Sequence, residues 1–191
     1  MKFDRKKFFD EYKSRFATKL NQSQVDGIEQ LLAFIENDPA MTDVRWIAYM
    51  MATVKHECAE RWQPIEEFAS GQQYEGRKDL GNTEKGDGRR FKGRGYVQIT
   101  GRANYRKFSQ RLSIDLVGNP LLALDPPTSY KIASLGMRQG LFTGKALIDY
   151  IHDSVCDYRN ARRIINRLDK ADKIKGHAEK LELALRASQL S

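Results

Sequence analysis

The sequence KGRGYVQITGRANY at residues 92–105 is the most informative stretch of the chain. Its three glycines let backbone approach a ligand closely, and Gln98, Thr100 and Asn104 offer neutral hydrogen-bonding groups suited to sugar hydroxyls and acetamides. The stretch lacks the GxxxxGK[ST] pattern of a phosphate-binding loop. Arginine, glycine and aromatic residues also alternate here as they do in some RNA-binding segments, so a nucleic-acid interface is the alternative.

Basic residues are concentrated around this stretch. Residues 77–111 contain 11 Lys and Arg against 3 Asp and Glu, an excess that equals the net charge of +8 of the whole chain. Residues 71–101 also hold eight of the fourteen glycines. A basic surplus is typical of proteins that act against a polyanion, such as nucleic acid or an anionic cell envelope.

The composition is that of a globular protein. The chain has 191 residues, of which 40% are hydrophobic and 30% charged, and it has neither internal repeats nor an apolar run long enough to span a membrane. We therefore expect a single catalytic domain over residues 1–191 with no separate cell-wall-binding module. The N-terminus lacks the apolar region of a secretory signal, so we expect the protein to stay in the cytoplasm until another factor releases it.

Apolar residues recur at helical spacing through most of the chain. The pattern predicts helices near residues 3–16, 25–35, 44–58, 103–112, 130–137, 146–151, 158–168 and 174–187. Residues 69–96 are glycine-rich and polar, which indicates an ordered loop with at most a short β-hairpin, and residues 96–100 alternate like a short strand. The predicted fold is mainly α with one long functional loop.

Neither the cysteines nor the histidines suggest a metal or redox site. Cys58 and Cys156 lie 98 positions apart, which favours two free thiols over a disulfide scaffold. His56, His152 and His177 lack the spacing of metal ligands, so we expect no metal and no cofactor.

Acidic residues cluster just before the basic stretch. Glu57 follows the apolar face of the helix predicted at 44–58, where partial burial would raise the pKa of its carboxyl as a general acid requires. Glu66 and Glu67 follow a proline within ten residues, and Glu75 and Asp79 come later in the loop. Two carboxylates that flank one bond can hydrolyse a glycoside, although isolated loop acids are more often solvated.

The motifs taken together resemble family 19 glycoside hydrolases, which comprise plant-type chitinases and related bacteriophage endolysins. The resemblance rests on His56-Glu57, on PxEE at 64–67, on YEGRxDLGNT at 74–83 and on the stretch up to Tyr105. It continues in NARRIIN at residues 160–166 and spans about residues 44–185. It implies a lysozyme-like, two-lobed fold.

The resemblance also implies roles for individual residues. Glu57 matches the general acid, Thr100 the hydroxyl residue that holds the attacking water, and Gln98 and Asn104 residues of the sugar subsites. We place Tyr74 and Asn166 with the substrate-binding residues. For the second carboxylate we rank Glu66 first, then Glu67, with Glu75 close behind.

The C-terminal part departs from the family pattern. Asn166-Arg167-Leu168 stands where the family has glycines after the asparagine, and the arginine expected further along has no certain counterpart. Lys175, His177 and Lys180 are its nearest candidates.

The expected function is that of a monomeric phage endolysin, a lysozyme-type enzyme that hydrolyses β-1,4 bonds of peptidoglycan and lyses the host cell. We expect a holin to release it from the host cytoplasm and the basic surface to attract the anionic envelope. The basic helix near the C-terminus could also touch a membrane, although closing the core explains its pattern better. The alternatives are a chitinase of the same fold that acts on N-acetylglucosamine polymers, and a nucleic-acid-binding protein that uses residues 77–111.

Overall fold

The computed structural model describes residues 1–190 and divides the chain into two compact units. The terminal unit combines Met1–Trp62 with the chain from Ser134 onward, and the central unit is Gln63–Ala133. Helix α6 (Pro126–Gln139) begins in the central unit and ends in the terminal unit. No helix among the described residues combines the length and the apolarity needed to cross a membrane.

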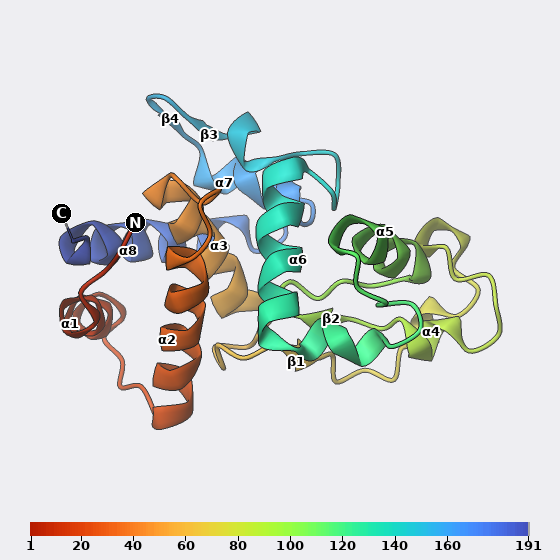
Figure 1. Cartoon of the computed structure of the whole chain (residues 1–191). Helices are drawn as coiled ribbons and strands as arrows, with labels where there is room; N and C mark the ends of the chain where they lie inside the picture. Colours follow the sequence, from red (N-terminus) through yellow and green to blue (C-terminus); the bar gives the residue numbers. More distant parts are fainter. Residues whose placement is uncertain (191) are drawn as a thin grey trace. The chain divides into compact units, whose positions relative to one another are not determined.

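Five helices and two short turns build the terminal unit besides its part of α6 (Figure 1). They are α1 (Arg5–Phe16), α2 (Gln22–Glu36), α3 (Val44–Glu57), the 3-10 turn η4 (Leu147–Asp149), α7 (Tyr158–Ala161), the 3-10 turn η5 (Arg162–Ile164) and α8 (Ala171–Ser188). A two-stranded hairpin joins β3 (Ile151–His152) to β4 (Val155–Cys156). Helix α8 packs against both α3 and α1.

The core of the terminal unit surrounds α3. The Asp43 side chain caps this helix by accepting from the Arg45 backbone N–H, and the helix is buried on all sides from Ile47 to Lys55. The apolar face of α8 lies against it, and Ile174, Leu181 and Leu185 are fully buried. The apolar side chains that recur along α8 therefore pack in the core of the terminal unit.

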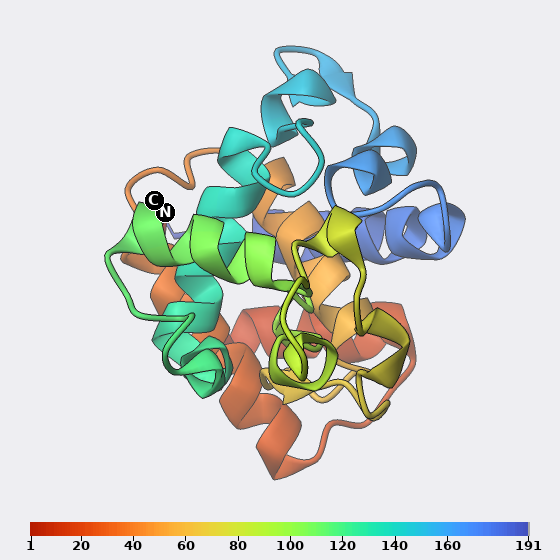
Figure 2. The ribbon, with the colours of Figure 1, turned by 90° about the vertical axis from the view of Figure 1, so that its right-hand side faces the viewer.

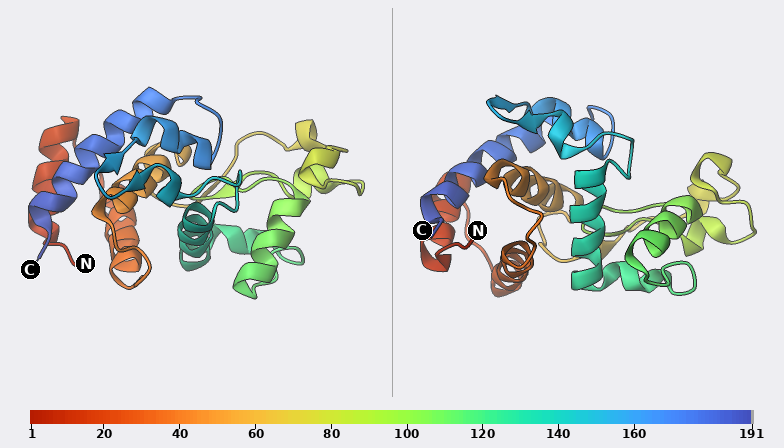
Figure 3. Two further views of the ribbon diagram at one scale, coloured as in Figure 1. Left: turned by 90° about the horizontal axis from the view of Figure 1, so that it is seen from above. Right: turned by 45° about the horizontal axis from the view of Figure 1, so that its top comes forward.

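The two ends of the chain meet in this unit (Figure 3). The backbone N–H of Asp4 donates to the Ser188 carbonyl at 2.8 Å, and that of Leu190 donates to the Lys2 carbonyl at 2.9 Å. These bonds tie the start of α1 to the end of α8.

The central unit is organised around one pair of short strands. Strand β1 (Ile65–Glu66) pairs antiparallel with β2 (Arg94–Gly95), in a register that places Ile65 opposite Gly95. Between them lie η1 (Gln72–Tyr74), η2 (Lys78–Leu80) and α4 (Asp87–Arg90). Helix α5 (Arg102–Leu112), the 3-10 turn η3 (Pro120–Leu124) and the start of α6 complete the unit. Figure 2 shows η1 beside α4 and η2 beside α5.

Three local predictions need correction. Residues 96–100 form a turn rather than a strand, because Gly95 (φ +91°) and Gln98 (φ +54°) adopt left-handed conformations and Arg94 and Ile99 exchange backbone hydrogen bonds. The hairpin β3–β4 replaces the end of the helix predicted at 146–151. The helix predicted at 158–168 ends at Ile164.

Two helical glycines of the terminal unit offer a matched test of this packing. A Cβ added at Gly27 in α2 would lie 2.5 Å from the Trp62 carbonyl oxygen, whereas one added at Gly176 in α8 meets nothing within 4 Å. We expect Gly27→Ala to lower the free energy of unfolding by ~1–3 kcal/mol through overpacking. Gly176→Ala should raise it by ~0.5–1 kcal/mol, because alanine loses less backbone entropy in a helix. Urea titration monitored by circular dichroism measures both, and equal effects would contradict the close approach of α2 to Trp62.

Candidate active site

Glu57 is the last residue of α3 and forms an ion pair with a buried arginine. Its Oε1 accepts from Arg162 Nη1 at 2.7 Å, and the side chains of Glu57 and Arg162 are 17% and 3% exposed. The guanidinium is itself held from behind, because Arg162 Nε donates to the Asp169 carbonyl at 3.0 Å. The helix pattern suggests a purely apolar environment for this carboxyl. Instead, the carboxyl is partly exposed and is held in place by Arg162.

Arg162 is a site residue that the sequence analysis missed. The resemblance leads one to expect an arginine after Asn166, but the guanidinium on Glu57 comes from η5, 105 residues after Glu57 and before Asn166. The signal was present in the quoted motif NARRIIN, whose first arginine is Arg162. None of Lys175, His177 and Lys180 forms a hydrogen bond or ion pair with Glu57 in the part of the chain that the structure describes.

Asn166 belongs to the same part of the terminal unit. Its backbone N–H donates to the Arg162 carbonyl at 2.9 Å, so the turn that places the Glu57 partner also places Asn166. Its side chain is exposed, and its Oδ1 accepts from the Arg167 backbone N–H at 2.8 Å.

Glu66 is held by two cations in the central unit. Its two carboxylate oxygens lie 2.6 Å from Lys92 Nζ and 2.7 Å from Arg94 Nε. Partial burial favours the neutral carboxyl, but the hydrogen bonds from Lys92 and Arg94 outweigh it and lower the pKa of Glu66. Glu66 is therefore ionised at neutral pH, and its side chain is still 35% exposed.

Three of the predicted site residues surround Gly93. A Cβ added at Gly93 would lie 3.0 Å from Gln98 Oε1, 3.3 Å from Thr100 Oγ1 and 3.4 Å from Glu67 Cδ. A side chain at this position would crowd the group, and one of the three neighbouring side chains would have to shift by a few tenths of an ångström. We call Glu67, Gln98 and Thr100 the Gly93 cluster.

Hydrogen bonds fix each member of the Gly93 cluster. Glu67 accepts from the Gly93 N–H and from the Tyr74 hydroxyl, both at 3.0 Å. Gln98 Nε2 donates to the Ile65 and Gly95 carbonyls, each at 2.8 Å. Burial, reinforced by the hydrogen bond to Glu67, raises the pKa of Tyr74.

Asn104 extends this group from the first turn of α5. Its Nδ2 donates to the Thr100 carbonyl at 2.8 Å, while the Thr100 hydroxyl lies 3.0 Å from the Gln98 carbonyl. Five predicted residues thus form two hydrogen-bonded groups that both border Gly93: Glu67 with Tyr74, and Gln98 with Thr100 and Asn104. Many of the hydrogen bonds of these side chains are made to backbone groups.

Glu75 supports the loop. Its two oxygens accept from the backbone N–H groups of Gly86 at 2.6 Å and Gly88 at 2.9 Å, and these bonds lower the pKa of its carboxyl. A carboxylate tied to the start of α4 in this way has a structural role. Asp79 is paired with Arg77 on the surface.

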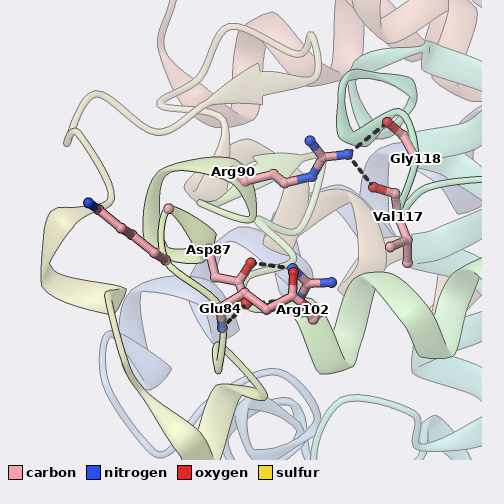
Figure 4. A pocket seen from close by; sticks show the side chains of 8 residues that line it. Glu84, Asp87, Arg90, Arg102, Val117 and Gly118 are labelled. Carbon is pink, nitrogen blue, oxygen red and sulfur yellow. Dashed lines mark hydrogen bonds and ion pairs between the residues drawn. The ribbon is translucent and has the colours of Figure 1, made fainter.

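Among the described residues, four of the eleven cations of residues 77–111 form ion pairs with carboxylates of the central unit: Arg77, Lys92, Arg94 and Arg102. Figure 4 shows a cavity in which Arg102 contacts Glu84 and Asp87 and in which Arg90 donates to the Val117 and Gly118 carbonyls. With the pairing of Lys92 and Arg94 to Glu66, part of the basic stretch neutralises carboxylates and caps carbonyls.

Histidines and cysteines lie outside these groups. Within residues 1–190 no three His, Cys, Asp or Glu side chains are grouped closely enough to hold a metal ion. Burial lowers the pKa of His56, and it lowers that of His177 to about 4. Cys58 is buried and Cys156 exposed, and both are free thiols, as the sequence predicted.

Comparison with solved structures identifies the fold. Chitinase C from Streptomyces griseus HUT6037 matches with a TM-score of 0.57 at 16% identity, over 93% of this chain and 74% of that one. A glutamate-to-glutamine mutant of chitinase C matches with a TM-score of 0.55 at 16% identity, over 97% of this chain and 91% of that one. The predicted mainly helical, lysozyme-like fold is thus confirmed. No protein-family model matches the chain.

The ion pairs of Glu66 predict how its titration responds to mutation. Because the folded pKa of Glu66 lies below its unfolded value, the group stabilises the fold above the unfolded pKa, and this contribution is lost as the pH falls through the folded pKa. Lys92→Gln should raise the pKa of Glu66 and weaken this pH dependence. Carboxyl carbon NMR titration measures the shift, with Lys78→Gln as a control of equal charge change. An unchanged Glu66 titration in Lys92→Gln would contradict the ion pair.

Proposed function

We propose that this chain is a glycoside hydrolase that cleaves β-1,4 bonds of bacterial peptidoglycan, and that it serves a phage as an endolysin. The observation that carries the proposal is the convergence of Glu67, Gln98 and Thr100 around Gly93, with Tyr74 and Asn104 bonded to them, because the family 19 resemblance associates these residues with catalysis and sugar binding. The fold shared with chitinase C supports a polysaccharide as substrate. As an endolysin the enzyme would meet its substrate after a holin opens the host membrane.

In this proposal two carboxylates divide the chemistry. Glu57 donates a proton to the leaving glycosidic oxygen from its place at the end of α3, where Arg162 fixes the orientation of the carboxyl. Glu66 is the second carboxylate, since Lys92 and Arg94 keep it ionised and able to activate water. The Thr100 hydroxyl helps to hold that water.

Chitin is the second candidate substrate, supported by the names of the two structural neighbours. Chitin and the peptidoglycan glycan share β-1,4-linked N-acetylated sugars, so groups that bind the sugar ring serve either polymer. The nucleic-acid alternative has less support, because many of the cations in residues 77–111 are paired within the protein.

Replacing the proposed acid tests the function directly. Glu57→Gln keeps an oxygen that accepts from Arg162 but removes the transferable proton, so we expect murein hydrolysis to fall by about 10²–10⁴-fold. Loss of the charge that faces buried Arg162 should also lower the free energy of unfolding, and circular dichroism verifies that the variant is folded. The measurement is release of soluble fragments from purified murein, with the new reducing-end sugar identified by mass spectrometry. Chitin oligomers assayed in parallel decide between the two polymers. Activity retained in Glu57→Gln would remove Glu57 as the acid.

Glutamine substitutions at the three other acids, assayed side by side, identify the second carboxylate. Glu66→Gln should abolish hydrolysis as Glu57→Gln does. Glu75→Gln should mainly speed amide exchange at Gly86 and Gly88, because it weakens the bonds that these N–H groups donate. If Glu67→Gln abolishes hydrolysis while Glu66→Gln retains it, the base is Glu67.

A further inference from the structure

A second surface cavity lies in the terminal unit, beside Asn166. It has a volume of about 460 Å³ and is lined by Thr143, Lys145, Arg163, Ile165, Asn166 and Arg167. We call Lys145, Arg163 and Arg167 the cationic triad. None of the three has a place in the chemistry proposed above.

Two loops are joined to make this cavity. Helix α6 ends at Gln139, and Gly140 (φ +66°) turns the chain so tightly that a Cβ there would lie 3.1 Å from the carbonyl carbons of Gly144 and Lys145. The Thr143 hydroxyl then lies 2.6 Å from the Arg163 carbonyl oxygen. Lys145 is thereby held opposite the segment that follows η5.

No counter-charge faces the triad in its cavity. Within residues 1–190 no carboxylate forms an ion pair with Lys145, Arg163 or Arg167, and no acidic residue lines the cavity. The cavity of Figure 4 differs, since its arginines face Glu84 and Asp87 from its own lining. Three exposed cations around one hollow form a site suited to an anion.

The shape of the groups favours carboxylates. A guanidinium presents a planar fork of donors that matches a carboxylate with two parallel hydrogen bonds, and the triad contains two guanidiniums and one ammonium. Asn166, the residue assigned to sugar contact, lies on the same wall. A ligand that fits this cavity is therefore a sugar with carboxylates attached nearby.

We propose that the cationic triad binds the carboxylates of the peptidoglycan stem peptide while Asn166 contacts the glycan. This inference rests on the proposed function and names the part of the substrate that the terminal unit recognises. Chitin has no carboxylate to offer the triad. A peptidoglycan strand stripped of its peptides retains one carboxylate per disaccharide, on the lactyl ether, whereas an intact strand carries several on each stem.

The test uses the variant Lys145→Gln/Arg163→Gln/Arg167→Gln on three substrates: peptide-bearing murein, the same murein stripped by an amidase, and chitin oligomers. We expect the ratio of kcat/KM for peptide-bearing to peptide-free strands to fall about tenfold, which corresponds to fractions of a kcal/mol from each exposed ion pair. The loss should appear mainly in KM, because the triad binds a part of the substrate that does not react.

A control variant separates specific binding from general attraction to a polyanion. Lys7→Gln/Lys19→Gln/Lys131→Gln removes the same number of exposed charges at residues that do not line the cavity and should leave the ratio unchanged. An unchanged ratio in the triad variant, or an equal fall in both variants, would overturn the inference. Thermal unfolding verifies that both variants are folded.

Binding is also measured without turnover, so that the two proposals fail separately. A soluble disaccharide-tetrapeptide and its peptide-free disaccharide are titrated into the Glu57→Gln protein by calorimetry, with and without the triad substitutions. Tighter binding of the peptide-bearing ligand that disappears in the triad variant supports the inference even if the wild type fails to hydrolyse murein. Equal affinity for the two ligands overturns it even if hydrolysis is established.

Discussion

Burial of α3 on all sides is the constraint on which the terminal unit depends. A helix surrounded by protein cannot send charged side chains into water, so each charge near its end needs a partner. Lys55 meets this need with Glu60 at 3.0 Å and with the rings of Tyr12, Phe16 and Trp62, whose centroids lie 5.0–5.9 Å from its Nζ. Burial still lowers the pKa of Lys55, against the effect of Glu60.

Glu57 meets the same need with Arg162, and this pairing gives the helix its proposed chemical role. A partner from η5 orients the carboxyl where α3 reaches the surface, so the demand of a buried helix for charge compensation also positions a reactive group. Removing one partner of such a pair leaves the other charge uncompensated, which makes the pair a structural element as well. Orientation of the proposed acid and integrity of the core are therefore coupled.

The central unit is stabilised in a different way, because it has few helices and many polar loops. Its loops are held by side chains that bond to backbone: Glu75 to α4, Glu67 to Gly93, and Gln98 to both sides of the β1–β2 pair. The pairing of its arginines with nearby carboxylates and carbonyls belongs to the same scheme. The basic stretch that dominates the composition thus acts first as a scaffold, and the unpaired cations beside Asn166 lie elsewhere in the sequence.

Local patterns predicted the helices well, including the position of Glu57 at the end of α3. They failed where contacts distant in sequence or unusual backbone conformations decide the structure. Arg162 was missed because nothing local indicates that it reaches Glu57, and the turn at 96–100 was missed because Gln98 adopts a left-handed conformation that its residue type rarely takes. Sequence motifs named the members of the Gly93 cluster, but only coordinates showed that they meet around one glycine.

The chain order of the two units has a consequence for biosynthesis. The central unit is continuous in sequence, so all of its residues have left the ribosome before α8 is made, whereas the terminal unit joins α1 and α3 to a helix near the other end of the chain. The core around α3 can close only after residues 171–188 of α8 have been synthesised, and Glu57 has no Arg162 until residue 162 emerges. A nascent chain that has not reached residue 162 therefore lacks the partner that orients the Glu57 carboxyl, although the whole central unit has already been made.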